Sequence, residues 1–398
     1  MSDTSLPRGF QFAGVASGVK TTQGVEDLAL IFSDRDATIA GVYTTNLVCA
    51  APVNVDRERT PTSRGRVVVV NSGNANACTG SQGTADALAM VAAAAESVDV
   101  DQSQSLVLST GVIGSFLPMP KILAGIKQAA GQLAGDEAGF LAANRGMLTT
   151  DSGPKHGRLS WQGEGLEYRM AGLAKGAAMI SPQMATMLAV IVSDVALDEE
   201  TAQQSLRAAV DQSFNCISVE GHTSTNDTVL LVANGAAGGP PLDGAELERF
   251  QQQLDQLCLT LAKMIPSDGE GATHLIRIEV QGAASDQDAR KVATTVADSN
   301  LVKTGIAGCD PNWGRIVSAV GYAGVPLEVT DVSLQLNGMA IFAKGVPLEF
   351  DQKVASQSMR DQRETLIELR VGDGPGRCRF WTSDLTVEYV SFNSEYHT

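Results

Sequence analysis

The sequence predicts an α/β fold of two or three domains. Short apolar runs typical of buried strands alternate with longer segments of helical periodicity. A strand at 66–70 precedes an alanine-rich helix at about 84–98, and a strand at 106–109 precedes a helix at about 118–133. The chain has 398 residues, which is enough for more than one hydrophobic core.

The other expected elements continue this alternation. Further strands are expected at 10–16, 28–33, 187–192 and 275–280, with a hairpin over 159–170. Further helices are expected at about 198–212, 244–264, 286–300 and 352–360. The tail from Phe380 is apolar and alternates like a strand almost to its end. Because free termini usually fray, we expect such a tail to be held by the rest of the molecule.

Composition narrows the class of protein. The chain is 43% hydrophobic and 19% charged, as a globular enzyme would be. Its net charge of −16 argues against nucleic acid or an anionic membrane as a partner, and is interpreted as a contribution to solubility. No apolar stretch has the length of a signal peptide core or a membrane span, so we expect a cytoplasmic protein. The six cysteines form no Cys-x-x-Cys pair and the four histidines are scattered, which predicts reduced thiols and no metal site.

One stretch combines a small polar loop with an apolar strand. Residues 175–188 read Lys-Gly-Ala-Ala-Met-Ile-Ser-Pro-Gln-Met-Ala-Thr-Met-Leu, and Thr186 stands where the loop becomes the strand. The stretch closely resembles the cleavage motif of the ornithine acetyltransferase family. In that family an Ala–Thr bond breaks itself and the freed threonine is the nucleophile. The resemblance implies cleavage at Ala185–Thr186 in this chain.

The chemistry of threonine suits this role. A threonine hydroxyl is a weak nucleophile unless a base lies beside it. After cleavage the α-amine of Thr186, with a pKa of roughly 7.7 to 8.0, is such a base. In the cleavage itself the same hydroxyl attacks the Ala185 carbonyl, the acyl group moves from nitrogen to oxygen, and water opens the ester. The alternative interpretation is an ordinary β-branched residue at the start of a strand.

Other motifs of the family recur in the first half of the chain. Residues 109–114, Ser-Thr-Gly-Val-Ile-Gly, match the stretch that forms the oxyanion hole in the family. The resemblance implies that the Thr110 hydroxyl and the Gly111 backbone N–H donate hydrogen bonds to the negatively charged carbonyl oxygen. Residues 148–155 resemble a substrate loop, in which Thr149 and Thr150 would hold polar groups of the substrate. Lys175 offers a cation for a carboxylate of the substrate or of the protein.

The second half supplies the remaining candidate residues. Glu270 lies in an Asp-Gly-Glu-Gly-Ala-Thr motif, and its carboxylate could receive the ammonium group of an ornithine-like ligand. In the tail, Asn393 and Thr398 match residues that line the substrate site of the family. The chain departs from the family pattern at several motif positions, which are Cys216, Ser218, Glu220, His222, Ser267 and His274.

Two polar segments have two interpretations each. Residues 223–227, Thr-Ser-Thr-Asn-Asp, form either a wall of the active site or a polar turn that satisfies its own hydrogen bonds. Asn74 and Asn76 either bind substrate or build a turn.

The resemblance covers residues 14–398 and implies both a fold and an activity. The fold would be a layered α/β sandwich of the ornithine acetyltransferase/DmpA-like type, with a smaller C-terminal α/β lobe at roughly 280–380. Cleavage would give fragments 1–185 and 186–398, assembled as a heterotetramer with two copies of each. The implied enzyme is a glutamate N-acetyltransferase of arginine biosynthesis, which moves acetyl from N-acetylornithine to glutamate by a ping-pong cycle through acetyl-Thr186.

No cofactor is implied, although acetyl-CoA could be a second acetyl donor. Two other readings stay open. The first is an N-terminal-nucleophile aminopeptidase or amidohydrolase of the same fold, in which water completes deacylation. The second is an uncleaved binding protein without catalytic activity.

Overall fold

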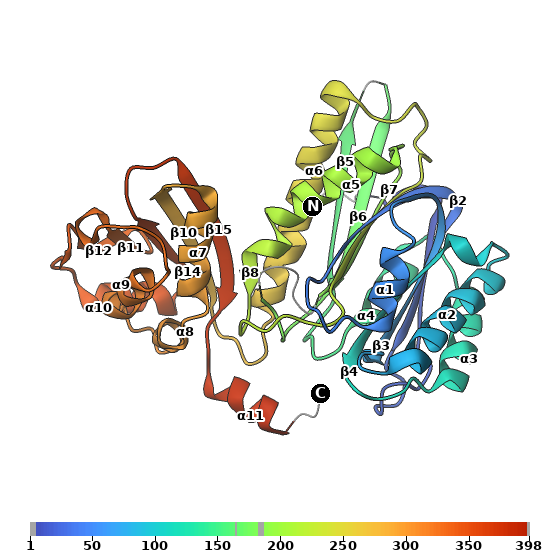
Figure 1. Cartoon of the computed structure of the whole chain (residues 1–398), viewed down its shortest axis with the longest axis horizontal. Coiled ribbons are helices and arrows are strands. Elements are labelled where there is room, and N and C mark those ends of the chain that lie inside the picture. The colour runs from blue at the N-terminus through green and yellow to red at the C-terminus, as the bar shows by residue number, and fades with distance from the viewer. Residues whose placement is uncertain (1–4, 164, 182–186, 396–398) are drawn as a thin grey trace.

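The protein folds into two lobes joined along one side (Figure 1). The structure is a computed structural model that describes residues 5–163, 165–181 and 187–395. The larger lobe is built from the N-terminal and central segments and the smaller lobe from the C-terminal segments. The last helix, α11 (Val387–Glu395), leaves the smaller lobe and lies below the junction of the two lobes.

The larger lobe is organised by one mixed sheet. Its strands run in the order β4-β3-β2-β9-β7-β6-β5, and β1 pairs with β2. These strands are β1 Phe10–Val15, β2 Leu28–Tyr43, β3 Thr62–Asn74, β4 Ser105–Val112, β5 Lys155–Gln162, β6 Glu167–Lys175, β7 Leu188–Ser193 and β9 Thr228–Ala233. Its helices are α1 Ala51–Arg57, α2 Gly80–Ser97, α3 Met119–Ala130, α4 Glu137–Met147, α5 Glu199–Asp211 and α6 Gly244–Ser267.

Alternating side chains of the central strands pack on opposite faces of this sheet. In β3, Val67 and Val69 pack with Met90 of α2, whereas Val68 and Val70 pack with Phe140 of α4. Because every second side chain of a strand points to the same face, a run of consecutive valines fits a strand that is covered on both sides. The sheet is therefore the middle layer of a layered α/β structure.

Helix α4 was not expected from the sequence, and glycines explain why. Gly139 and Gly146 lie within it, and glycine is a poor helix former. A Cβ atom on Gly139 would lie 2.7 Å from the Phe12 carbonyl oxygen, and one on Gly146 would lie 2.7 Å from the Leu28 carbonyl oxygen. The glycines thus let the helix backbone approach the strands closely, so packing on the sheet stabilises a helix of low intrinsic propensity.

The smaller lobe has its own sheet, in the order β13-β12-β11-β14-β10-β15-β8. Its strands are β8 Ile217–Ser218, β10 Leu275–Ala283, β11 Ser333–Leu336, β12 Met339–Ala343, β13 Val346–Pro347, β14 Glu364–Arg370 and β15 Gly376–Ser383. Its helices are α7 Asp286–Ala297, α8 Asn300–Ala307, α9 Trp313–Gly321 and α10 Gln352–Arg360. Strand β8 comes from the chain between α5 and β9 and pairs in parallel with β15, so this sheet ties the two lobes together.

The α/β fold class is confirmed, and one expected element is wrong. The tail was expected to be strand-like almost to its end, but beyond β15 it forms the helix α11. A strand needs a neighbour for its backbone hydrogen bonds, whereas a helix satisfies most of them within itself. The apolar side chains Val387, Val390 and Phe392 are exposed on α11, so their alternation with polar residues does not reflect one buried face.

Candidate active site

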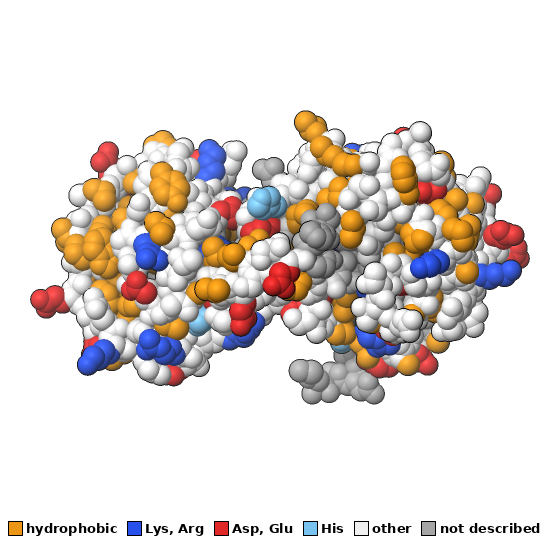
Figure 2. Space-filling view, turned by 90° about the horizontal axis from the view of Figure 1, so that it is seen from below, with side chains coloured by type: hydrophobic (Ala, Val, Ile, Leu, Met, Phe, Trp, Pro, Cys, Tyr) orange, Lys and Arg blue, Asp and Glu red, His pale blue; other side chains and the backbone are white. Residues whose placement is uncertain are grey.

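A cavity of about 230 Å³ lies at the junction of the lobes, between the ends of β4 and β6 and the helix α11. Its volume is below the roughly 300–1,000 Å³ of sites for drug-sized ligands, so it suits a small metabolite. Acidic side chains and a histidine gather where the two lobes meet (Figure 2). Among the residues lining the cavity are Thr110, Gly111, Thr149, Thr150, Lys175, Glu270 and Asn393.

The end of β4 carries the two residues expected to stabilise an oxyanion. Gly111 has a φ of +133°, and a Cβ atom there would lie 2.3 Å from the carbonyl carbon of Gly73. Only glycine therefore fits this position. Thr110 is 2% exposed, and its Oγ1 accepts a hydrogen bond of 3.3 Å from Lys175 Nζ. The Thr110 hydroxyl thus lies beside a cation in a water-poor wall, where a hydrogen bond to a developing negative charge is strong.

Lys175 ends β6 with its ammonium group buried in this wall. Burial lowers the pKa of Lys175, while the carboxylates of Asp151, Asp227 and Glu270 oppose that effect. A buried cation without partners would be costly, so these acids make its position tolerable. Lys175 is also one of the residues that line the cavity.

Asp151 connects Lys175 to the loop that carries the two candidate threonines. Burial alone would raise the pKa of Asp151, but Lys175 and Lys155 lower it to about 2. Its Oδ1 accepts hydrogen bonds of 2.6 Å from Lys155 Nζ and from the Gly176 N–H. Its Oδ2 accepts a hydrogen bond of 2.9 Å from the Thr149 N–H. Asp151 therefore fixes the backbone of both loops that meet at the cavity.

Glu270 and Asn393 come from distant parts of the chain and meet in the cavity wall. Glu270 lies in the turn after α6, and its N–H donates to the Ala177 carbonyl at 3.1 Å. Its Oε2 accepts a hydrogen bond of 2.9 Å from Nδ2 of Asn393 on α11. The amide thereby orients the carboxylate, and the last helix contributes directly to the site.

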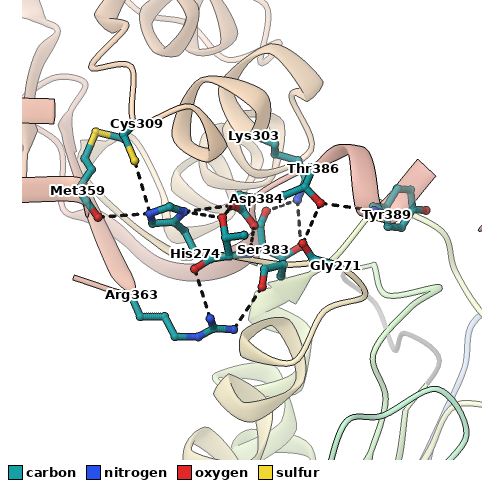
Figure 3. Close-up of polar contacts among 12 residues, drawn as sticks. Gly271, His274, Lys303, Cys309, Met359, Arg363, Ser383, Asp384, Thr386 and Tyr389 are labelled. Atoms are coloured by element: carbon teal, nitrogen blue, oxygen red, sulfur yellow. Dashed lines mark hydrogen bonds and ion pairs between the residues drawn. The ribbon is translucent and has the colours of Figure 1, made fainter. Parts of the chain in front are cut away.

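A network of polar contacts fixes the start of α11 to the Glu270 turn (Figure 3). The Thr386 hydroxyl donates to the Gly271 carbonyl at 2.8 Å and accepts from the Tyr389 N–H at 3.4 Å. Just before it, Asp384 Oδ1 accepts a hydrogen bond of 2.9 Å from the Thr273 N–H. These contacts hold the start of α11 against the turn, so the tail is attached to the rest of the molecule at this helix, as expected.

The structure brings together most of the residues proposed from the sequence. Thr110, Gly111, Thr149, Thr150, Lys175, Glu270 and Asn393 line the same cavity. Ala185, Thr186 and Thr398 lie outside the described residues. Met187, which follows Thr186 in the sequence, donates its N–H to Asp227 Oδ1 at 3.0 Å. Asp227 itself is buried, and burial raises its pKa well above the ordinary value.

Comparison with known proteins identifies the family. A family model described as the ArgJ family matches residues 11–398. The chain belongs to the ArgJ family. It is 49% identical over 396 residues to the arginine biosynthesis bifunctional protein ArgJ of Rhodopirellula baltica, and the match covers 99% of this chain and 96% of that protein. The protein of the same name from Geobacter sulfurreducens is 44% identical over 393 residues, with 98% and 99% covered.

A solved structure gives the same result. The crystal structure of the arginine biosynthesis bifunctional protein argJ from Bacillus halodurans is 37% identical, with a TM-score of 0.50. The match covers 51% of this chain and 96% of that chain, so the solved polypeptide is about half as long as this one.

The residues that depart from the expected motif pattern make contacts of their own. At His274, Nδ1 lies 3.1 Å from Asp384 Oδ2 and Nε2 lies 3.3 Å from the Met359 carbonyl oxygen (Figure 3). At Ser267, the carbonyl accepts a hydrogen bond of 2.7 Å from Arg363 Nη2. A cation from another segment therefore lies beside the Glu270 turn.

The cysteine and serine departures have separate contacts. Cys216 is buried, and a hydrogen bond with the Cys378 thiol lowers its pKa. The Ser218 hydroxyl donates to Asp298 Oδ1 at 2.6 Å. The remaining departures, Glu220 and His222, line the cavity.

The sequence left the role of two polar segments open, and their contacts now distinguish them. Ser224, Thr225 and Asn226 line the cavity, so this turn is part of its wall. Asn226 Nδ2 also donates to the carbonyls of Ala75 and Ser109 at 2.7 and 2.8 Å, which connects this wall to β4. Asn74 and Asn76 instead make hydrogen bonds within their own loop and to neighbouring backbone.

Some residues of the cavity were missed because no sequence signal marked them. Tyr389 and Met179 line the cavity, but each stands in a segment whose motif points to another residue. Within residues 5–163, 165–181 and 187–395, no group of three His, Cys, Asp or Glu side chains could hold a metal ion. The described helices include none that is long and apolar enough to cross a membrane.

Proposed function

We propose that this member of the ArgJ family is a glutamate N-acetyltransferase that moves the acetyl group of N-acetylornithine to glutamate in arginine biosynthesis. One observation carries the proposal. A single small cavity combines the oxyanion pair Thr110 and Gly111 with the Glu270–Asn393 pair. The first pair suits an acyl carbonyl and the second suits an amino-acid substrate.

The proposed cycle has two half-reactions through Thr186. The α-amine of Thr186 takes the proton of its hydroxyl, and the oxygen attacks the acetyl carbonyl carbon of N-acetylornithine. The carbon–nitrogen bond breaks, the proton passes to the leaving amine, and ornithine departs from an acetyl ester. The neutral amine of glutamate then attacks the ester carbonyl, and the threonine oxygen regains its proton as N-acetylglutamate leaves.

Cavity residues have separate parts in this cycle. Thr110 and Gly111 would donate to the carbonyl oxygen while it carries negative charge in each half-reaction. Lys175, Thr149 and Thr150 would hold the carboxylate and other polar groups of the amino acid, together with Asn393 and Thr398. Glu270 would pair with the side-chain ammonium of ornithine.

Self-cleavage at Ala185–Thr186 belongs to the same proposal, because it creates the α-amine that acts as base. The solved chain of the Bacillus halodurans relative is about half as long as this chain, as either fragment of a cleaved protein would be, which supports this step. The names of the curated relatives call them bifunctional. For this chain we propose that acetyl-CoA is the second donor and that no bound cofactor takes part.

Initial rates test the cycle. Varying N-acetylornithine at several glutamate concentrations should give parallel double-reciprocal lines, and without glutamate the acetyl mass should remain on fragment 186–398. Thr110→Ala should slow each half-reaction by roughly 10²–10³-fold. Intersecting lines without an acetylated fragment would contradict the cycle, and release of free acetate or amino acids from acyl or peptide substrates would favour the aminopeptidase alternative. A parallel assay with acetyl-CoA as the only donor tests the second activity.

A further inference from the structure

Glu220 lies in the wall of the cavity, and the proposed cycle gives it no part. Its side chain is 10% exposed. Its Oε1 accepts a hydrogen bond of 2.7 Å from the Ile180 N–H. Its Oε2 is buried and has no hydrogen-bond partner among the described residues. A buried carboxyl oxygen without a partner is costly, and Glu220 lines the cavity, where a polar ligand could supply the missing partner.

Among the described residues, titratable groups from several segments face Glu220. Lys303 approaches from α8, Glu270 from the turn after α6, and Tyr389 from α11. On its own loop, His222 Nδ1 lies 3.8 Å from Glu220 Oε1. Asp298, at the end of α7, interacts with Lys303 and His222.

Burial has the largest effect on the charge of Glu220. It raises the pKa of Glu220 to about 8, and the negative charge of Glu270 adds to the rise, while the Ile180 N–H and Lys303 oppose it. At pH 7 the carboxyl is therefore mostly neutral, but a nearby cation would favour its ionised form.

The proposed reaction, on which this inference rests, sets an electrostatic problem. One cavity binds two amino acids in turn, and their side chains carry opposite charges. A permanent carboxylate attracts the ammonium of ornithine but repels the carboxylate of glutamate. A carboxyl group that gains or loses a proton can accept a hydrogen bond from the first and donate one to the second.

We propose that Glu220 determines specificity for both substrates, accepting a hydrogen bond as a carboxylate from the ornithine-type ammonium and donating one as a carboxylic acid to the side-chain carboxylate of glutamate. Its neighbour Glu270 remains the partner of the ammonium alone. The pair thus gives one cavity two charge states, one for each half-reaction.

The test compares wild type with Glu220→Gln in each half-reaction. Glutamine keeps the acceptor for the Ile180 N–H and an N–H donor, but it cannot ionise. At pH 7, KM for N-acetylornithine should rise roughly tenfold, because a charge-assisted hydrogen bond is lost, and KM for glutamate should change by less than about threefold. At pH 9, kcat/KM for glutamate should be about tenfold higher in the variant than in wild type, since one pH unit above its pKa leaves about one tenth of Glu220 protonated.

The substrates and the α-amine of Thr186 titrate in the same way in wild type and in Glu220→Gln. Their contribution to the pH dependence therefore cancels when the two proteins are compared. Glu248→Gln, on the exposed side of α6 and outside the cavity, is the matched control and should behave like wild type. Glu220→Asp keeps an ionisable group. In this variant, kcat/KM for N-acetylornithine and kcat/KM for glutamate should again change in opposite directions with pH.

Equal loss for both substrates, or no difference in pH dependence between wild type and Glu220→Gln, would overturn the proposal while the acetyl transfer itself stands. A wild-type enzyme that fails to transfer acetyl between these substrates would instead overturn the proposed function and this inference with it.

Discussion

At the scale of single residues, the site is a set of buried charges that depend on one another. Lys175 is tolerated because Asp151 lies beside it, and Asp151 is held ionised by Lys175 and Lys155. Glu270 is oriented by Asn393. Removing one partner of such a group leaves the other buried and uncompensated, which costs more than the loss of an exposed ion pair.

Glu270→Gln should raise KM for N-acetylornithine roughly 10- to 100-fold, because a charge-assisted hydrogen bond to the ammonium is lost. Unlike Glu220→Gln, the Glu270→Gln variant should not have a higher kcat/KM for glutamate than wild type at pH 9. Steady-state kinetics at pH 7 and pH 9 with both substrates separate the two variants. Unchanged KM values would show that the carboxylate of Glu270 does not contact the substrate.

Asp151→Asn should destabilise the protein in a way that depends on pH. The pKa of Asp151 falls from 3.8 to about 2 on folding, which corresponds to roughly 2.5 kcal/mol. This stability is present above pH 4 and is lost as the pH falls toward 2, so the difference between wild type and variant should shrink below pH 4. Denaturant unfolding at pH 7, 4 and 3 measures it. Asp211→Asn, which breaks the more exposed ion pair with Arg290, should cost less than about 1 kcal/mol at pH 7.

At the scale of elements, the sequence predicts best where packing and local pattern agree. Helix α10 begins and ends at the expected residues, Gln352 and Arg360. Strand β2 was expected to end at Ser33 but continues to Tyr43. The polar residues 34–36 interrupt its pattern because they lie at an irregularity in the pairing with β3, between Phe32 and Ala37. Local periodicity cannot distinguish such a bulge from the end of a strand.

The candidate site shows the same limit. The motifs around Thr110, Lys175 and Glu270 stand out in the sequence, and the structure places all three in one cavity. Helix α11 could not be predicted, because its position depends on long-range contacts with the Glu270 turn rather than on its own pattern. The raised pKa of Glu220 likewise results from burial by segments that are far apart in the sequence.

Thr386→Val should loosen the attachment of α11. It removes the hydrogen bond to the Gly271 carbonyl and the acceptor for the Tyr389 N–H. Because α11 carries Asn393, KM for N-acetylornithine should rise about fivefold, the equivalent of roughly 1 kcal/mol, with little change in melting temperature. Thr260→Val is the control, since the exposed Thr260 makes a similar bond to the Gln256 carbonyl on α6. Equal effects of the two substitutions would show that the Thr386 contacts do not support the site.

At the scale of the whole molecule, the larger sheet interleaves the two fragments that cleavage would produce. Strands β7 and β9 follow the Ala185–Thr186 bond in the sequence, and they lie between β2 and β6, which precede it. Six residue pairs join β6 to β7, from Met170–Ser193 to Lys175–Leu188, and six join β2 to β9. Cleavage would therefore leave both fragments in one sheet with a shared core.

This arrangement predicts how purified protein should behave. Under denaturing conditions wild type should separate into fragments 1–185 and 186–398, whereas Thr186→Ala should stay one inactive chain of 41.6 kDa, because it lacks the hydroxyl that attacks Ala185. Under native conditions the wild-type fragments should elute together, since parting them would expose the central strands of the sheet to water. If two copies of each fragment assemble, as the family resemblance implies, light scattering should give twice the mass of one chain. Intact mass spectrometry that finds only the uncleaved chain in active enzyme would contradict cleavage, and fragments that part without denaturant would contradict the shared sheet.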